Sequence, residues 1–172
     1  IVTMFGVMVA SFCILTGLIM NDSMVALLHG GLTSSIKYEY LYRLNSLEEG
    51  TPDKGEALFQ NYYEVDGSTV QFSAQGISEN SKYFPDKTDS GDKLELDKYY
   101  LTSAAAQTYG VKAGDELTFF NIADLEEHKV KISGIVTDNT HCYLYTGRSN
   151  ATRLAGVGDG VYNCIISADK LE

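Results

Sequence analysis

The sequence predicts an α+β fold: a mixed, mostly antiparallel sheet with two short packed helices, preceded by an N-terminal transmembrane and stalk helix. Residues 1–21 contain no Asp, Glu, Lys or Arg, which is typical of a membrane span or a fully buried helix. From Ile36 onward, several runs alternate apolar and polar residues with a period of two, as half-buried strands do. Two short runs, 103–109 and 150–154, lie next to good N-cap residues and are predicted to be helices.

The N-terminal run is long enough to cross a bilayer, since a transmembrane helix needs about 20 apolar residues. A signal peptide would require a basic start and a cleavage site, but the first basic residue is Lys37. The chain also begins at Ile1, without a Met start. We therefore expect a fragment of a longer protein that begins inside a membrane span (1–21), with a buried core helix as the alternative.

Residues 22–35 are predicted to form a stalk. Asp22 and its neighbours interrupt the apolar run with polar groups, and Met24 then resumes it. Gly30 and Gly31 follow as a pair, and they mark either the end of the helix or a hinge.

Residues 36–172 are expected to form the folded domain. The run 36–44 carries tyrosines at alternate positions and predicts a strand whose Tyr-rich face packs into the core. The run 56–64 could be a helix or a strand; as a strand it would form a hairpin with 69–77. Residues 45–55 and 78–92 are loops by composition.

The best-patterned part of the chain is 93–138. Thr102 or Ser103 can cap the first helix, and Gly110 can end it in the left-handed conformation. A turn at Gly114-Asp115 leads to two strands, 116–120 and 129–136. The remaining elements are the second helix, 150–154, and a last strand, 161–168.

Charge and reactive residues exclude several classes of function. The net charge is −10, and between Glu48 and Asp97 there are twelve acidic residues against four lysines, so nucleic-acid binding is not expected. His141 and Cys142 are neighbours that would point to opposite faces of a strand, and the histidines have no metal-binding spacing. We expect no catalytic residues, no metal and no cofactor. Cys142 and Cys164 are a candidate disulfide in an exported domain.

The segment from Leu101 to Phe119 resembles a signature of FtsX-like (MacB-like) ABC transporter permeases. In the extracytoplasmic domain of that family, a helix ends in leucine- or tyrosine-glycine, and a short turn ending in glycine-aspartate leads into a strand. Here these pairs are Tyr109-Gly110 and Gly114-Asp115. Other segments are similar to the stalk, first strand and later strands of the family: 22–24, 37–40, 131–136 and 139–145.

The resemblance implies a permease subunit that pairs with a cytoplasmic ATPase and couples ATP hydrolysis to movement outside the membrane. Family roles include lipoprotein or peptide export, peptide sensing and control of cell-wall hydrolases, so a peptide, a lipoprotein or a hydrolase is an expected partner. The implied location is the cell membrane, with the domain on a Gram-positive cell surface, and a second span is expected after Glu172. The family's outer domains have no fixed catalytic residues, which implies that this chain is not an enzyme.

Two alternatives remain open at this point. One is a membrane-anchored ligand-binding or sensor module, with a pocket between the Tyr-rich strand and the loop around Tyr83. The other is a membrane-anchored extracellular hydrolase, which would need an activated nucleophile in a cleft.

Overall fold

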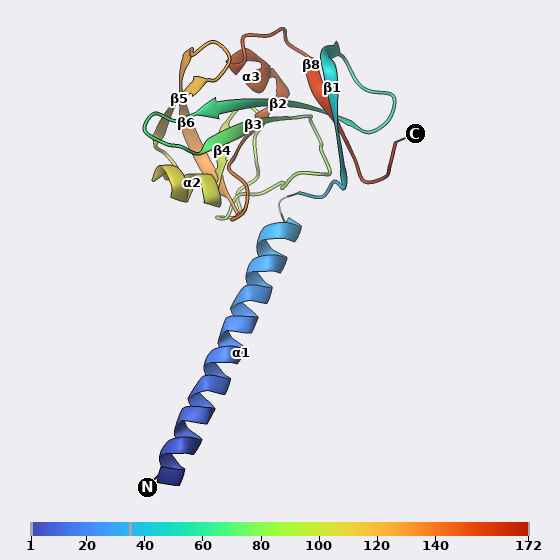
Figure 1. Cartoon of the computed structure of the whole chain (residues 1–172). Helices are drawn as coiled ribbons and strands as arrows, with labels where there is room; N and C mark the ends of the chain where they lie inside the picture. Colours follow the sequence, from blue (N-terminus) through green and yellow to red (C-terminus); the bar gives the residue numbers. More distant parts are fainter. Residues whose placement is uncertain (1, 35, 172) are drawn as a thin grey trace.

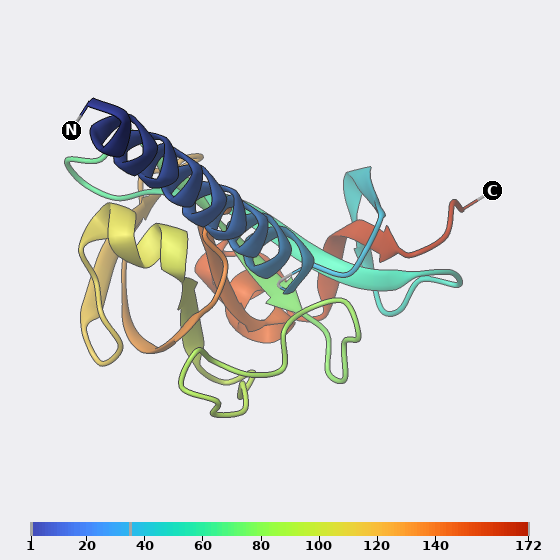
Figure 2. The same cartoon turned by 90° about the horizontal axis from the view of Figure 1, so that it is seen from below.

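The computed structural model describes the backbone of residues 2–34 and 36–171, and the side chains of residues 8, 9, 11–25 and 36–171. Within this part of the chain, a long helix, α1 (Val2–Ser34), leads into a domain of eight strands and two short helices. Figure 1 shows α1 leaving the domain as a separate rod, and in the view from below in Figure 2 the helix crosses in front of the domain.

The eight strands form one mixed sheet in the order β1-β8-β2-β3-β7-β4-β6-β5. The pairs β3–β7 and β4–β6 are parallel, and the other pairs are antiparallel. The predicted fold class, an α+β domain with a mostly antiparallel sheet, is therefore confirmed. The strands are β1 (Tyr40–Glu49), β2 (Glu56–Glu64), β3 (Gln71–Ile77), β4 (Tyr99–Thr102), β5 (Glu116–Asn121), β6 (Glu127–Val136), β7 (Tyr143–Gly147) and β8 (Val161–Ser167).

The sheet closes on itself. Strand β2 also pairs with β5 through Tyr63 and Glu64, so the six strands from β2 to β5 in the sheet order form a barrel. The first residues of β2 pair instead with β8, and β8 and β1 extend from the barrel as a two-stranded flap. Strand β1 is therefore an edge strand with one neighbour.

An aromatic cluster fills the barrel. The rings of Tyr63, Phe72 and Phe119 are mutual neighbours, with centroids 5.0–5.6 Å apart in the three pairs. Such aromatic pairs add roughly 0.5–1.5 kcal/mol each beyond the burial of their area. The rest of this core is mainly aliphatic: Ala74, Leu101, Ala105, Leu117, Val130, Ile132, Leu144 and Leu154.

The first short helix, α2 (Ser103–Tyr109), lies where the sequence predicts it. The Thr102 side chain accepts a hydrogen bond from the Ala105 amide and caps the first turn. Gly110 ends the helix at φ 68°, in the left-handed region that glycine adopts without strain.

The second short helix, α3 (Arg148–Leu154), begins two residues earlier than predicted and packs on β2 and β3. Its approach to the sheet requires a glycine, because a Cβ added at Gly76 would lie 2.7 Å from the Cβ of Ala151. The run 56–64, which was ambiguous in the sequence, is strand β2 and forms the predicted hairpin with β3.

Helix α1 is continuous across the predicted boundary between span and stalk. Its described apolar side chains point in all directions around the axis, and ten of them are exposed: Met8, Val9, Phe12, Ile14, Leu15, Leu18, Ile19, Met20, Met24 and Val25. Among the described residues, no helical stretch combines the length and hydropathy that a membrane crossing requires. The side chains of residues 1–7 and 10, which belong to the predicted span, lie outside the described residues.

The first predicted strand of the domain is displaced. The sequence places it at 36–44, whereas β1 runs from Tyr40 to Glu49 and includes residues assigned to a loop. Tyr40 is 37% exposed instead of lying in the core, because an edge strand has a neighbour on one side only. Tyr38 precedes the strand and is the tyrosine of this run that packs against the core.

Candidate functional site

The candidate disulfide is not formed. Cys142 and Cys164 are free thiols and pack in two different hydrophobic clusters. Cys164 is in β8, and Cys142 directly precedes β7, which is three strand spacings away in the sheet order. Three spacings amount to about 14 Å, whereas a disulfide requires Cα atoms within roughly 7 Å.

The candidate hinge lies inside α1. The helix continues through Gly30 and Gly31 and ends at Ser34, so the glycine pair does not end it. A hinge at this pair stays a prediction.

His141 is paired with Asp138 and not with Cys142. The buried Asp138 carboxylate lies 3.1 Å from the Nδ1 atom of His141, and its other oxygen accepts hydrogen bonds from the Thr140 amide, the Thr140 hydroxyl and the His141 amide. The imidazole is stacked on the ring of Tyr143, with centroids 5.0 Å apart and planes inclined by 11°. Aspartate and threonine two residues apart are turn-forming side chains, which is the sequence feature that could have predicted this arrangement.

The turn at Asp138 is tied to the start of α2. The Ser103 hydroxyl accepts a hydrogen bond from the Asp138 amide at 2.9 Å and donates one to the Val136 carbonyl. The Thr102 hydroxyl donates to the carbonyl of His141 at 2.6 Å. These bonds hold the turn in place between β6 and β7. The hydroxyls of Thr102 and Ser103 therefore have a structural role.

Two clefts meet at the end of β3 where it leaves the sheet. The first, about 370 Å³, is lined by Ile77 to Ser81, by Phe84 to Asp86, and by Lys93, Leu94 and Leu96. The second, about 470 Å³, shares Ile77, Ser78, Glu79 and Leu96 and extends to the start of α3 at Arg148. Both volumes lie in the range of small-molecule sites.

The predicted pocket between the Tyr-rich strand and the Tyr83 loop is filled by side chains. Tyr83 and Phe84 are buried, and the Phe84 ring lies edge-on to Tyr38, with centroids 6.0 Å apart. Within the described residues, the clefts lie beside this loop and have no lining residue from β1.

The face of β2, β3 and β7 that points away from the barrel core is unusually polar; we call it the outer face. One row across it consists of Gln60, Gln75 and Tyr145, and the next consists of Tyr62, Ser73 and Tyr143. Gln75 and Tyr145 are fully buried, yet the Oε1 atom of Gln75 and the hydroxyl of Tyr145 have no hydrogen-bond partner among the described residues. Buried polar atoms are normally paired, so these two mark an unusual environment.

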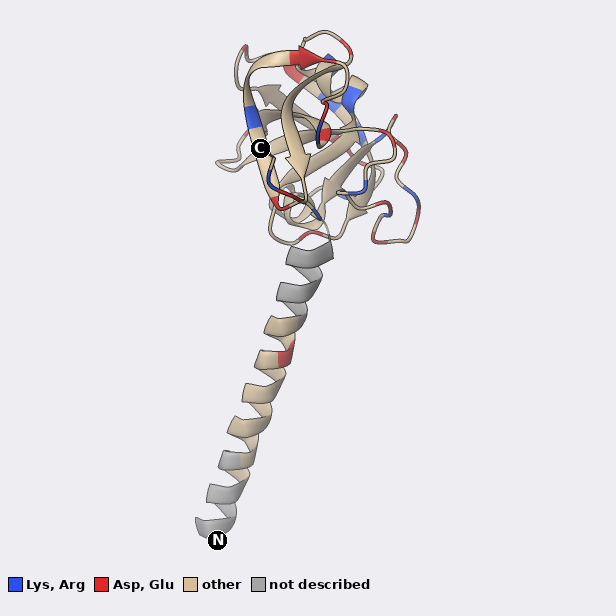
Figure 3. Ribbon diagram, turned by 90° about the vertical axis from the view of Figure 1, so that its right-hand side faces the viewer, with Lys and Arg blue, Asp and Glu red and all other residues tan. Residues whose placement is uncertain are grey.

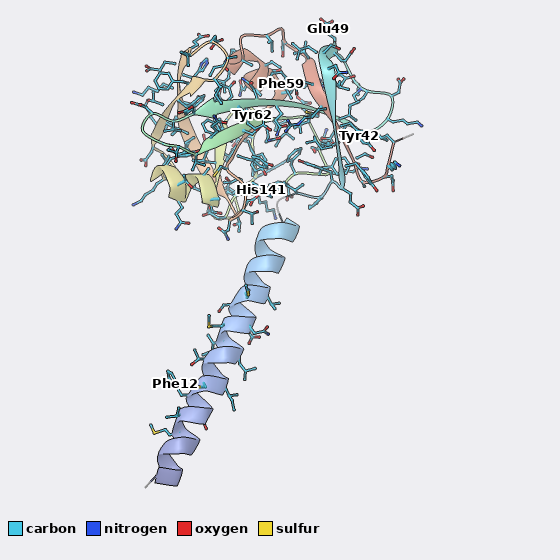
Figure 4. The ribbon with its side chains drawn as sticks, viewed as in Figure 1. Phe12, Tyr42, Glu49, Phe59, Tyr62 and His141 are labelled. Carbon is cyan, nitrogen blue, oxygen red and sulfur yellow. The ribbon has the colours of Figure 1, made fainter. Side chains whose placement is uncertain are left out.

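Arg43 from β1 lies at the border of the outer face. Its guanidinium donates a hydrogen bond of 2.5 Å to the Tyr62 hydroxyl, and its central carbon lies 5.7 Å from the centre of that ring. We call Arg43, Tyr62, Tyr143 and His141 the Tyr–Arg strip. Figure 4 shows Tyr62 under β2 and His141 near the end of the domain from which α1 departs.

Burial raises the pKa values of the tyrosines around the strip. The pKa of Tyr38 is raised to about 12, mainly because burial disfavours its phenolate. The pKa of Tyr143 is also raised, and that of Tyr145 lies well above the usual value for tyrosine, again chiefly through burial. These hydroxyls therefore remain protonated at neutral pH and can donate hydrogen bonds.

No protein-family model matches the sequence, and no curated protein sequence matches it. Among solved structures, the chain is similar to the periplasmic region of MacB from Actinobacillus actinomycetemcomitans, at 14% sequence identity and a TM-score of 0.42. The similarity covers 84% of this chain and 80% of that one. The function is therefore argued from the residues of the chain itself.

Proposed function

We propose that this chain is the extracytoplasmic domain, with its leading helix, of an ABC transporter permease subunit. In this proposal a cytoplasmic ATPase hydrolyses ATP, and α1 transmits the resulting movement to the domain outside the membrane. The finer roles implied by the sequence resemblance are lipoprotein or peptide export, peptide sensing and control of cell-wall hydrolases.

The observation that carries the proposal is the exposed apolar surface of α1. Ten large apolar side chains on the described part of the helix are 44–73% exposed. Asp22 is the one charged residue in that part (Figure 3). Burying a large apolar side chain is worth about 1.5–3 kcal/mol, so covering the exposed parts of these ten would contribute roughly 10–20 kcal/mol. That contribution is comparable to the whole stability of a domain, about 5–15 kcal/mol, which supports a lipid or protein environment around the helix.

A second observation supports the transmission of movement. Between α1 and β1, the Lys37 amide donates to the carbonyl of Tyr83 at 2.9 Å, and the Glu39 amide donates to the carbonyl of Ser167 at 3.1 Å. The linker is therefore bonded to the long loop after β3 and to the end of β8. A displacement of α1 would pull on both segments, which is the coupling that a mechanical permease needs.

Cysteine labelling of the full-length protein in intact cells tests the proposal. Native Cys13 lies on α1, and Ser46→Cys would place a thiol at an exposed position of β1. The two cysteines are compared one at a time, with the other native cysteines replaced by Ala. A membrane-impermeant maleimide should label Ser46→Cys on intact cells and should reach Cys13 only after the membrane is dissolved. Equal labelling of Cys13 on intact cells, or labelling of Ser46→Cys only after lysis, would contradict the proposal.

The ATPase partner is tested separately. Affinity purification of the full-length protein in mild detergent should recover a nucleotide-binding subunit whose ATPase activity requires the permease. Recovery of the protein with no associated ATPase activity would contradict the permease proposal and would favour a membrane-anchored domain without an ATPase partner.

A ligand-binding module is the second candidate function. It is favoured by the two adjoining clefts at the end of β3. This function is compatible with the first, because a permease domain that moves can also sense.

A further inference from the structure

The Tyr–Arg strip contains an arginine that is not neutralised by the protein. The chain has 23 acidic residues against 13 basic ones. Even so, none of the three ion pairs among the described residues involves Arg43. The residue is exposed, and within the described part of the chain its guanidinium hydrogen-bonds to the neutral hydroxyl of Tyr62. The ring of Tyr62 therefore holds the guanidinium in place while leaving most of its N–H groups available.

Aromatic rings flank this arginine in a defined order. Tyr62 and Tyr143 occupy the same row of the outer face, on either side of Ser73. They are two strand spacings apart, about 10 Å. Ser73 is a small residue, and its hydroxyl donates to the Asn61 carbonyl and accepts from the Gln75 amide group. The row therefore has two partly exposed rings, with the short polar side chain of Ser73 between them.

The polar groups behind this row are incompletely bonded. Gln75 and Tyr145 form the adjacent row on the same face, two residues along their strands from Ser73 and Tyr143. Gln75 leaves an acceptor and Tyr145 leaves a hydroxyl without partners in the described structure. Both atoms are buried under neighbouring side chains, so a ligand on the row would contact the exposed guanidinium and the partly exposed rings, and not these two groups.

We propose that the Tyr–Arg strip binds the C-terminal carboxylate of a peptide, with Arg43 pairing with the carboxylate and the rings of Tyr62 and Tyr143 packing against the last side chains. A carboxylate is planar and matches the two-pronged geometry of a guanidinium. One arginine also matches one negative charge, whereas a polyanion or an anionic lipid surface would be repelled by the acidic domain. This inference is independent of the permease proposal, because it concerns binding by the domain alone.

The position of the strip gives such binding a consequence. Tyr38, from the linker between α1 and β1, packs against the same hydrophobic cluster as Tyr143, so the linker side chain lies on the side of the sheet that carries the strip. A peptide on the strip would therefore sit beside the segment that joins α1 to the domain, where it could bias the position of the helix.

The test is an NMR titration of the full chain in lipid nanodiscs. The probe is N-acetyl-Ala-Phe-Ala with a free carboxylate, compared with its C-terminal amide, with free phenylalanine and with inorganic phosphate. Side-chain resonances of Arg43, Tyr62 and Tyr143 report on the strip. The variants are Arg43→Gln and Arg43→Lys, with Arg153→Gln as a matched control, because Arg153 is an exposed arginine of α3 that lines neither cleft.

We expect the free-acid peptide to shift the strip resonances saturably. The amide and the Arg43→Gln variant should each weaken binding at least tenfold, Arg43→Lys should weaken it less, and Arg153→Gln should leave it unchanged. Unchanged spectra elsewhere in Arg43→Gln show that the variant is folded. Equal binding of the amide, of phosphate or of free phenylalanine would overturn the assignment. Full binding by Arg43→Gln would also overturn it, as would the absence of a saturable shift at up to about 10 mM peptide, ten times a weak dissociation constant of about 1 mM.

Discussion

Replacing Tyr145 by Phe should stabilise the protein, which is the opposite of the usual effect of removing a buried hydroxyl. The Tyr145 side chain is fully buried, and its hydroxyl has no hydrogen-bond partner among the described residues. A buried hydroxyl without a partner costs roughly 1–3 kcal/mol by protein mutational data. Because Phe keeps the same ring contacts with Phe84 and Tyr143, we expect the free energy of unfolding to rise by about 1 kcal/mol.

Tyr100→Phe is the matched control. Tyr100 is also buried, but its hydroxyl accepts a hydrogen bond from the Glu95 amide at 3.0 Å. Removing that hydroxyl should lower the free energy of unfolding by about 0.5–1.5 kcal/mol and leave the Glu95 amide without its partner. The two Tyr-to-Phe changes remove the same atom from the same class of site and should move stability in opposite directions.

The assay is urea unfolding of the full chain in detergent, followed by near-ultraviolet circular dichroism of the tyrosines, which reports on the domain. At a fixed urea dependence, the midpoint should rise for Tyr145→Phe and fall for Tyr100→Phe. A loss of 1 kcal/mol or more in Tyr145→Phe would refute the reasoning. It would mean that the Tyr145 hydroxyl is bonded in solution, for example to a buried water that also serves Gln75.

Three further changes test other parts of the fold. Gly76→Ala should destabilise the domain by about 1–3 kcal/mol, because its new methyl group would lie 2.7 Å from the Ala151 Cβ. Gly158→Ala is the control in the same urea assay and should be close to neutral, because the nearest atom to its new methyl group would be 4.0 Å away. Asp138→Ala should lower the free energy of unfolding by about 2 kcal/mol or more, because it leaves two backbone amides and a hydroxyl without their acceptor. Thermal unfolding at pH 7 measures this change, and an unchanged midpoint would show that these hydrogen bonds do not stabilise the fold. Burial raises the pKa of Tyr63 to about 12 from an ordinary value near 10, so only the unfolded state is deprotonated between these values. Stability should therefore be insensitive to this group below pH 10 and fall as pH rises from 10 to 12; the Tyr63→Phe variant should lose less over that window, and an identical pH profile would contradict the assigned burial.

Local rules predicted the central part of the domain well. The helix over 103–109 has its cap at Thr102 and its stop at Gly110, because both depend on side chains adjacent in sequence. The alternation in 129–136 also predicted the buried face of β6, since a strand in the barrel wall packs one face on the aromatic core. Where neighbouring residues determine the conformation, the sequence was sufficient.

The outer face could not be predicted, because it depends on contacts between distant segments. A period of two assigns the Phe72 side of β3 to the core and leaves Ser73 and Gln75 for solvent. In the structure both faces of β3 are buried. The loop after β3, which by composition is a polar surface loop, buries Tyr83 and Phe84 beside the outer face, and the linker adds Tyr38. The pairing of Asp138 with His141 is local and could have been predicted, whereas the contact of Arg43 with Tyr62 brings together two strands that are not neighbours in the sheet.

The linker connects the two proposals physically. It is held by two backbone hydrogen bonds and by the contact of Tyr38 with Phe84, and none of these is strong by itself, since a net hydrogen bond is worth about 1 kcal/mol. A helix that moved in response to ATP hydrolysis could therefore detach or shift the linker without unfolding the barrel, whose aromatic core lies on the other face of the sheet. The coupling would also act in reverse. If movement of α1 carries Tyr38 between two positions, a peptide bound at Arg43 that packed better against one of them would favour the corresponding position of the helix. The size of that shift is limited to the difference between the peptide's affinities for the two positions, so the Tyr–Arg strip can act as a sensor only if the linker moves relative to it.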